Sequence, residues 1–202
     1  MTLYCATSNP GKLREFRLAG ERFGIGVLEV PGLQEIAPCE ETGRTFKENA
    51  VLKATYYGQH APGLLFADDS GLEVNALGGA PGVVSARYAG PGATDAQNNA
   101  LLLGNMRGRE KRRARFVCLI ALANRGEMLR TFRGVVEGEI LDEQRGPEGF
   151  GYDPLFFDPP YGKSFGEVSV EEKMAVSHRG RALTAMFRFV SDSPLARRVE
   201  KR

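Results

Sequence analysis

Apolar and polar residues alternate along the chain in patterns that predict several strands. Residues 3–6 form a short apolar run before a polar loop, and residues 64–66 form another run that stops at two carboxylates. Both runs have the length of a short buried strand. Residues 113–123 and 128–136 alternate between apolar and polar positions, and the turn-forming segment Asn124-Arg125-Gly126 separates them. This pattern predicts a β-hairpin.

Helical spacing of apolar residues marks four further segments. The clearest start is at Thr45, because Thr45 and Glu48 have the spacing of a capping box. Helices are expected after residue 12, from Thr45 to about Gln59 or His60, from Thr94 or Asp95 through Met106, and from Ser177 through Phe187. Strands that alternate with helices are typical of an α/β chain.

Composition narrows the class of protein. At 202 residues, the chain can form one large domain or two modest lobes around a cleft. The formal net charge of +2 is small, so no long-range field indicates a nucleic acid or a membrane surface as partner. A basic run at residues 107–115 is typical of a solvated surface, and nucleic-acid binding is the minority interpretation.

The cysteines and the N-terminal segment bear on the compartment. The three cysteines lie far apart and lack metal-ligand spacing, which predicts reduced thiols. The sequence shows neither the pattern of a signal peptide nor a segment of bilayer-spanning length. We therefore expect a cytoplasmic protein.

The most informative polar segment is Asp68-Asp69-Ser70-Gly71, directly after the apolar run at residues 64–66. Carboxylates at the end of a strand lie at a sheet edge, where α/β folds bind ligands. Two adjacent anions repel, so a divalent cation such as Mg²⁺ or a shared proton would explain their closeness. An ordinary Asp-rich turn is the alternative. Glu40 and Glu41 precede the second helix, where they either complement its dipole or join the aspartates around one Mg²⁺.

Two loops and a late basic group offer binding chemistry. The loop Thr7-Ser8-Asn9-Pro10-Gly11-Lys12 opens a helix and can hold phosphate, although its spacing is not that of a P-loop. Gly149-Phe150-Gly151-Tyr152-Asp153-Pro154 either offers an aromatic ring on which a base can stack or forms a tight turn with core aromatics. Lys173 and the pair His178-Arg179 supply donors for a carbonyl or phosphate, and His178 can equally be structural.

Taken in order, five blocks of this sequence resemble the inosine triphosphate pyrophosphatase family, whose members hydrolyse dITP, ITP and XTP. The blocks are Thr7-Ser8-Asn9-Pro10-Gly11-Lys12, Glu41-Thr42-Gly43 with Thr45-Phe46-Lys47-Glu48-Asn49-Ala50, residues 67–88, Phe150-Gly151-Tyr152-Asp153, and Ser177-His178-Arg179. They span nearly the whole chain, and their joint order argues against an accidental match.

The resemblance implies a fold and a site. It implies an α/β fold with an elongated central mixed β-sheet flanked by helices, in which residues 1–202 form a single domain of two lobes with a nucleotide-binding cleft between them, assembled as a homodimer. Asp69 would accept a proton and, with Glu40 or Glu41, hold Mg²⁺; Glu40 is the preferred ligand, and Asp68 is a further candidate. The substrate-binding residues would be Thr7, Ser8, Asn9, Pro10, Gly11, Lys12, Lys53, Ser70, Phe150, Gly151, Tyr152, Asp153, Lys173, His178 and Arg179.

The implied activity is hydrolysis of a nonstandard purine nucleoside triphosphate to the monophosphate and pyrophosphate. Asp69 would activate water for attack on the α-phosphorus, and Phe150 would stack on the purine while His178 or Arg179 meets its 6-keto oxygen. Two alternatives remain open. One is a related pyrophosphatase for modified pyrimidine or methylated nucleotides, and the other is a noncatalytic nucleotide- or RNA-binding protein that uses the basic run at residues 107–115.

Overall fold

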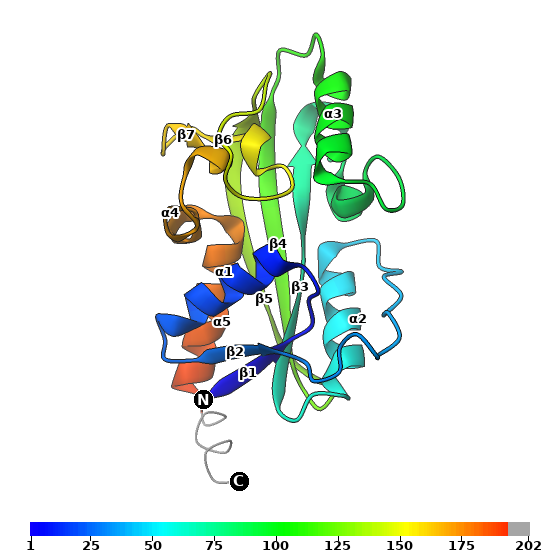
Figure 1. The fold of residues 1–202 in the computed structure, drawn as a ribbon, viewed down its shortest axis with the longest axis vertical. Coiled ribbons are helices and arrows are strands. Elements are labelled where there is room, and N and C mark those ends of the chain that lie inside the picture. Colours follow the sequence, from blue (N-terminus) through cyan, green and yellow to red (C-terminus); the bar gives the residue numbers. More distant parts are fainter. Residues whose placement is uncertain (194–202) are drawn as a thin grey trace. The chain divides into compact units, whose positions relative to one another are not determined.

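A computed structural model describes residues 1–193, which form seven strands and five α-helices (Figure 1). The strands are β1 (Thr2–Cys5), β2 (Gly26–Glu29), β3 (Leu64–Val74), β4 (Arg113–Asn124), β5 (Glu127–Ile140), β6 (Phe156–Asp158) and β7 (Lys163–Ser164). The helices are α1 (Pro10–Glu21), α2 (Phe46–Gly58), α3 (Asp95–Met106), α4 (Val170–Val176) and α5 (His178–Asp192). The strands form one mixed sheet in the order β2-β1-β3-β4-β5-β6-β7. The predicted α/β class and mixed sheet are therefore confirmed.

The chain divides into two compact units, and each unit is assembled from separate segments. Among the described residues, unit 1 contains residues 1–69, 118–134 and 179–193. Unit 2 contains residues 70–117 and residues 135–178. The strands β3, β4 and β5 contribute residues to both units.

Parallel pairing organises unit 1. β1 pairs in parallel with β2 and with β3. Figure 1 shows α1 and α5 on one side of these strands and α2 on the other. The buried rings of Phe16, Phe66 and Phe187 form part of the core, with centroid distances of 5.0 Å for Phe16–Phe66 and 6.3 Å for Phe66–Phe187. This packing joins α1, β3 and α5, which carry several of the candidate site residues.

A separate hydrophobic cluster fills unit 2. Its aromatic centre contains Phe116, Phe156 and Phe165, with centroid distances of 4.5 Å for Phe116–Phe156 and 5.1 Å for Phe156–Phe165. β6 pairs antiparallel with both β5 and β7. Tyr152 and Leu155 belong to the same cluster, so the core of unit 2 directly supports the glycine-rich segment around residue 150.

The predicted hairpin is present between β4 and β5, and both strands are longer than predicted. The two strands are neighbours in the sheet, and only Arg125 and Gly126 separate them. Arg125 has φ 50° and Gly126 has φ 82°. Positive φ at both central residues matches the tight turn that suits the twist of paired strands, and glycine adopts it without steric cost.

The prediction that Asp68 and Asp69 follow the end of a short strand is wrong. β3 continues to Val74, so both carboxylates lie inside an 11-residue strand. Two adjacent charges within a buried strand need partners on both faces of the sheet. Those partners come from three helices, α1, α2 and α5, and the local pattern of apolar residues cannot reveal them.

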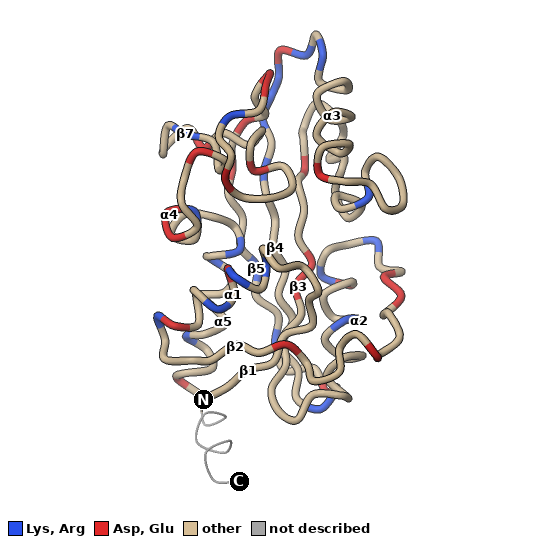
Figure 2. Tube along the Cα trace, viewed as in Figure 1, with Lys and Arg blue, Asp and Glu red and all other residues tan. Residues whose placement is uncertain are grey.

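Within residues 1–193, basic and acidic residues are mixed along the chain. Figure 2 shows Lys and Arg interspersed with Asp and Glu along the trace of each unit. Within the run at residues 107–115, Arg109 donates to the carbonyl of Ala76, and Arg112 donates to the carbonyl of Ile140. Part of the basic run therefore fastens backbone segments of unit 2 together.

Two further expectations concern thiols and membranes. The three cysteines are free thiols, as predicted. Within residues 1–193, no helix is both long enough and apolar enough to cross a membrane.

Candidate active site

The loop before α1 is shaped by helix capping. The side-chain oxygen of Asn9 accepts a hydrogen bond from the backbone N–H of Lys12 at 2.9 Å, so Asn9 is the N-cap residue. The backbone N–H of Asn9 donates to Thr7 Oγ1 at 3.2 Å, and Pro10 occupies the first turn of the helix. Ser8, Asn9 and Pro10 are exposed. The positive end of α1 therefore faces solvent, beside the Lys12 ammonium, as an anion-binding end requires.

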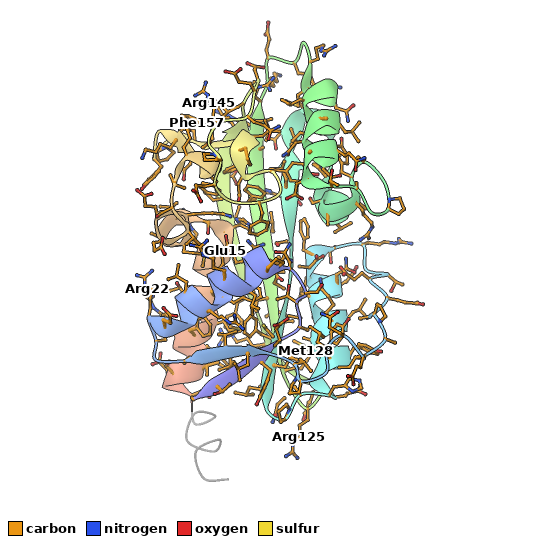
Figure 3. The ribbon with its side chains drawn as sticks, in the orientation of Figure 1. Glu15, Arg22, Arg125, Met128, Arg145 and Phe157 are labelled. Carbon is orange, nitrogen blue, oxygen red and sulfur yellow. The ribbon has the colours of Figure 1, made fainter. Side chains whose placement is uncertain are left out.

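Lys12 also belongs to a buried ion network. Its Nζ lies 3.0 Å from Asp68 Oδ1, while Arg179 Nε lies 3.6 Å from Asp68 Oδ2. Arg179 Nη1 donates to Glu15 Oε2 at 2.6 Å, and Figure 3 labels Glu15 on α1. Burial alone would raise the pKa of Asp68, but Lys12 and Arg179 hold it well below its usual range. Asp68 is therefore an ionised anchor between α1 and α5.

Asp69 follows Asp68 in the strand, so its side chain points to the other face, toward α2. Asn49 Nδ2 donates to Asp69 Oδ2 at 3.1 Å, and Lys53 Nζ lies 3.5 Å from Asp69 Oδ1. The same ammonium lies 3.2 Å from Glu41 Oε2. Burial, which Lys53 only partly offsets, raises the pKa of Asp69. Asp69 is therefore a stronger base than an ordinary aspartate, whereas Asp68 is a weaker one.

Asp69 and Glu41 suit a hard cation. Both offer only oxygen, and their side chains are 11% and 31% exposed, so lone pairs remain available. Glu40 is exposed and precedes Glu41 in the same loop. Within residues 1–193, no group of three or more His, Cys, Asp and Glu side chains is arranged to hold a metal ion. A cation bound here would take most of its ligands from water and phosphate, as Mg²⁺ commonly does.

Unit 2 gathers a second group of predicted residues around Asp153. Asp153 Oδ2 accepts from Lys173 Nζ at 2.5 Å and from the backbone N–H of Phe150 at 2.9 Å. Lys173 Nζ also lies 4.6 Å from the centroid of the Phe150 ring, within cation–π distance. A Cβ at position 149 would come within 2.4 Å of Asp153 Oδ2, so this turn requires Gly149. Phe150 is therefore half-buried, with its backbone N–H bound by Asp153 and the Lys173 ammonium over its ring.

The neighbouring residues Gly151 and Tyr152 are held by other parts of unit 2. The Gly151 N–H donates to Asp95 Oδ2 at 2.6 Å, and its carbonyl accepts from Asn99 Nδ2 at 2.9 Å. The Tyr152 hydroxyl donates to the Ser85 carbonyl at 2.8 Å. Burial raises the pKa of Tyr152, which keeps this hydroxyl protonated. Tyr152 is therefore a buried support of the loop.

Two further predicted site residues lie in unit 2, namely His178 and Ser70, and they differ in burial. His178 is buried, and its ring stacks on Phe116 at a centroid distance of 4.6 Å and an interplanar angle of 12°. Ser70 is half-buried and is the first residue of unit 2 on β3. His178 consequently has a packing role in the core, in addition to any contact with substrate.

Four residues that hold the predicted site residues in place are absent from the set predicted from the sequence. They are Glu15, Asn49, Asp95 and Asn99. A glutamate in a helix rich in charge predicts surface exposure, and only its place among the buried residues of α1 distinguishes Glu15. Asn49 stands one helical turn before Lys53, and that spacing was the available signal. No local signal identifies Asp95 or Asn99, because their partner Gly151 is distant in the sequence.

Known proteins are similar to this chain over most of its length, in sequence and in fold. The model of the Ham1 family matches residues 3–189. A dITP/XTP pyrophosphatase of Acidobacterium capsulatum is 49% identical over 195 residues, covering 92% of this chain and 96% of the relative. One from Thermus thermophilus is 48% identical over 204 residues, covering 100% and 97%. A solved HAM1 protein structure from Coxiella burnetii has a TM-score of 0.85 at 38% identity, covering 96% of this chain and 100% of that one. The chain belongs to the Ham1 family.

Proposed function

We propose that this protein hydrolyses nonstandard purine nucleoside triphosphates, namely dITP, ITP, XTP and dXTP, to the monophosphate and pyrophosphate. The observation that carries the proposal is the buried setting of Asp69, whose carboxylate accepts from Asn49 Nδ2 at 3.1 Å and lies 3.5 Å from the Lys53 ammonium, which also contacts Glu41. Relatives named dITP/XTP pyrophosphatase match nearly the full length of the chain. Such an activity would remove damaged purine nucleotides from the nucleotide pool.

The chemical step uses Asp69 as the acceptor. A water oxygen attacks the α-phosphorus, the bond from that phosphorus to the pyrophosphate oxygen breaks, and the water proton passes to the Asp69 carboxylate. Burial alone would lower the pKa of Lys53, but Asp69, Asp68 and Glu41 raise it overall, so Lys53 stays protonated. Its positive charge stabilises the carboxylates of Asp69 and Glu41 before the reaction, and it would stabilise the phosphate oxygens in the transition state.

Mg²⁺ would be held by Asp69 together with Glu41 or Glu40, and it would neutralise charge on the triphosphate. Glu41 and Asp69 both contact the Lys53 ammonium, which supports Glu41 as the second ligand, whereas the family resemblance favours Glu40. The exposed loop at the start of α1 would bind the phosphates through its backbone N–H groups and Lys12. The assignment of the metal ligands and that of the phosphate-binding loop can each be tested with site-directed variants.

The purine would stack on Phe150, whose ring is fixed by Lys173 and Asp153. His178, Arg179 or backbone donors would meet the 6-keto oxygen of hypoxanthine or xanthine. Adenine presents an amino group there and would leave those donors unpaired, which can reduce turnover by on the order of 10⁴. We also propose a homodimer in the cytoplasm, and light scattering of the purified protein tests the dimer.

The test is pyrophosphate release from dITP, XTP, dGTP, dATP and dUTP, each with Mg²⁺ and with a chelator. We expect rapid release from dITP and XTP, and loss of that release with the chelator. Preferential turnover of dUTP would favour the pyrimidine alternative. Absence of turnover with every nucleotide, combined with salt-sensitive RNA binding, would favour the noncatalytic alternative.

A further inference from the structure

Asn49 joins the loop that carries Glu41 to the carboxylate of Asp69. Its side chain is fully buried. Asn49 Oδ1 accepts from the backbone N–H of Gly43 at 2.8 Å, and Asn49 Nδ2 donates to Asp69 Oδ2 at 3.1 Å. One amide therefore uses its acceptor on the loop and its donor on the strand.

Lys53 makes the same kind of connection one helical turn later. It follows Asn49 by four residues, so the two side chains share a face of α2. The Lys53 ammonium contacts Glu41 in the loop and the other oxygen of Asp69, Oδ1. The helix thus bridges loop and strand twice, once with a neutral amide and once with a cation.

The loop backbone is fitted closely to the first turn of α2. A Cβ at Gly43 would lie 2.5 Å from Asn49 Oδ1 and 2.7 Å from Glu48 Cβ. Glu48 Oε2 accepts from the backbone N–H groups of Arg44 and Thr45 at 2.6 and 3.1 Å. Asn49 and the capping box therefore fasten residues 43–45 to the helix, and Glu41 stands two residues before this anchored segment.

We propose that Asn49 is a positioning residue that orients the Asp69 carboxylate and sets the place of the Glu41 loop relative to it. An amide donor occupies one direction at Oδ2 without adding charge, so the plane of the carboxylate is fixed while its other lone pairs remain available to water. Misplacement of a reacting group by about 1 Å can cost on the order of 10²-fold in rate. The proposal rests on the pyrophosphatase function proposed above.

Two substitutions at Asn49 distinguish the role of its side-chain donor from that of its acceptor. Asn49→Ala removes both hydrogen bonds. Asn49→Asp keeps the shape and the acceptor for the Gly43 N–H, but it replaces the donor toward Asp69 with an oxygen. We expect both variants to lower kcat for dITP by about 10- to 100-fold, with KM within about threefold of wild type.

Asn98 provides a matched control in unit 2. It is also a buried helical asparagine, whose Oδ1 accepts from the Ala89 N–H at 2.8 Å and whose Nδ2 donates to the Ala86 carbonyl at 3.2 Å. Asn98→Ala should leave kcat within about threefold of wild type. Circular dichroism on all three variants checks folding, and the nearly isosteric Asn49→Asp preserves the test if Asn49→Ala fails to fold.

A second readout does not require turnover. Mn²⁺, as a paramagnetic substitute for Mg²⁺, is titrated into the full chain without nucleotide and followed by electron paramagnetic resonance. We expect Asn49→Ala to weaken Mn²⁺ binding by about tenfold, as loss of a group that orients a metal ligand does, and Asn98→Ala to leave it unchanged.

The outcomes distinguish the two proposals. Wild-type kcat in Asn49→Asp would overturn the role of the Asn49 donor, and equal losses in Asn49→Ala and Asn98→Ala would show a general effect of losing a buried amide. If the wild type turns over no nucleotide, the proposed function fails by itself. The Mn²⁺ titration then decides the role of Asn49, because unchanged affinity in Asn49→Ala would overturn it.

Discussion

Asp68 and Asp69 are consecutive residues, yet their surroundings give them opposite properties. Asp68 meets Lys12 and Arg179 and has a lowered pKa, whereas Asp69 meets Asn49 and Lys53 and has a raised one. The sequence predicts the importance of both carboxylates because charge in an apolar segment is unusual. It does not predict their separate roles, since these depend on which helix packs on each face of β3: Asp68 meets Lys12 of α1 and Arg179 of α5, whereas Asp69 meets α2.

The first prediction concerns Asp69 itself. Asp69→Asn should lower kcat by about 10² to 10⁴, because the amide cannot accept the proton that the carboxylate accepts. Steady-state pyrophosphate release measures the loss, and circular dichroism checks the fold. Asp142→Asn serves as a control, because Asp142 is 88% exposed and its Oδ1 lies 3.0 Å from Arg112 Nη1 in unit 2. Wild-type turnover in Asp69→Asn would refute the role of Asp69 as acceptor.

A second prediction compares two ion pairs of equal length. Arg179–Glu15 and Arg115–Glu73 both measure 2.6 Å, but both side chains of the first pair are 3% exposed, against 42% and 25% in the second. Glu15→Gln should lower the free energy of unfolding by about 3 kcal/mol, since it leaves a buried guanidinium undercompensated. Glu73→Gln should cost less than about 1 kcal/mol. Urea denaturation measures both, and equal costs would contradict the argument from burial.

At the scale of elements, caps and turns were predictable because their signals are local. Thr45 and Thr94 cap α2 and α3 in complete capping boxes, and Arg125–Gly126 forms the hairpin turn. The pattern of apolar and polar residues does not predict β2, α4, β6 or β7. These elements have two to seven residues, too few for a hydrophobic period to emerge, and tertiary pairing defines the strands. For α4 a local signal exists, the capping box of Ser169 and Glu172, which marks where the helix starts but not that it continues.

The third prediction belongs to α3. Gly104 lies inside this helix and is exposed, and a Cβ there would meet nothing within 4 Å. Gly104→Ala should therefore stabilise the protein by about 0.5–1 kcal/mol, since alanine loses less backbone entropy in a helix. Thermal and urea unfolding both measure the change. A lower midpoint in either experiment would mean that position 104 has a packing constraint.

At the scale of the whole molecule, the order of five sequence blocks predicts the family and the α/β sheet. The same blocks do not predict which residues contact one another in the folded protein. Tyr152 stands in the predicted substrate-binding block, yet its hydroxyl bonds Ser85 and its ring joins the core of unit 2. The motif identifies residues that belong to the site, but only the packed structure shows which of them support a loop and which can contact the substrate.

The fourth prediction concerns acid stability. Because the pKa of folded Asp68 lies below its unfolded value of about 3.9, its stabilising effect is present above that pH and is lost as the pH falls toward the folded value. Below about pH 4, the free energy of unfolding of the wild type should fall more steeply than that of Asp68→Asn, by up to about 1.4 kcal/mol per pH unit. Urea denaturation at a series of pH values checks this, with Asp142→Asn expected to keep the wild-type slope.

The bond between Arg179 and Glu15 joins positions 164 residues apart and closes unit 1 with helices from the beginning and the end of the chain. During synthesis, α1 leaves the ribosome long before α5 exists. Until then, Glu15 is an acid inside a helix whose apolar side has no α5 to cover it. A prematurely terminated chain that lacks α5 would keep Lys12, Lys53 and Asp69 but could not complete the core that holds them, and it would become a substrate for chaperones and proteases.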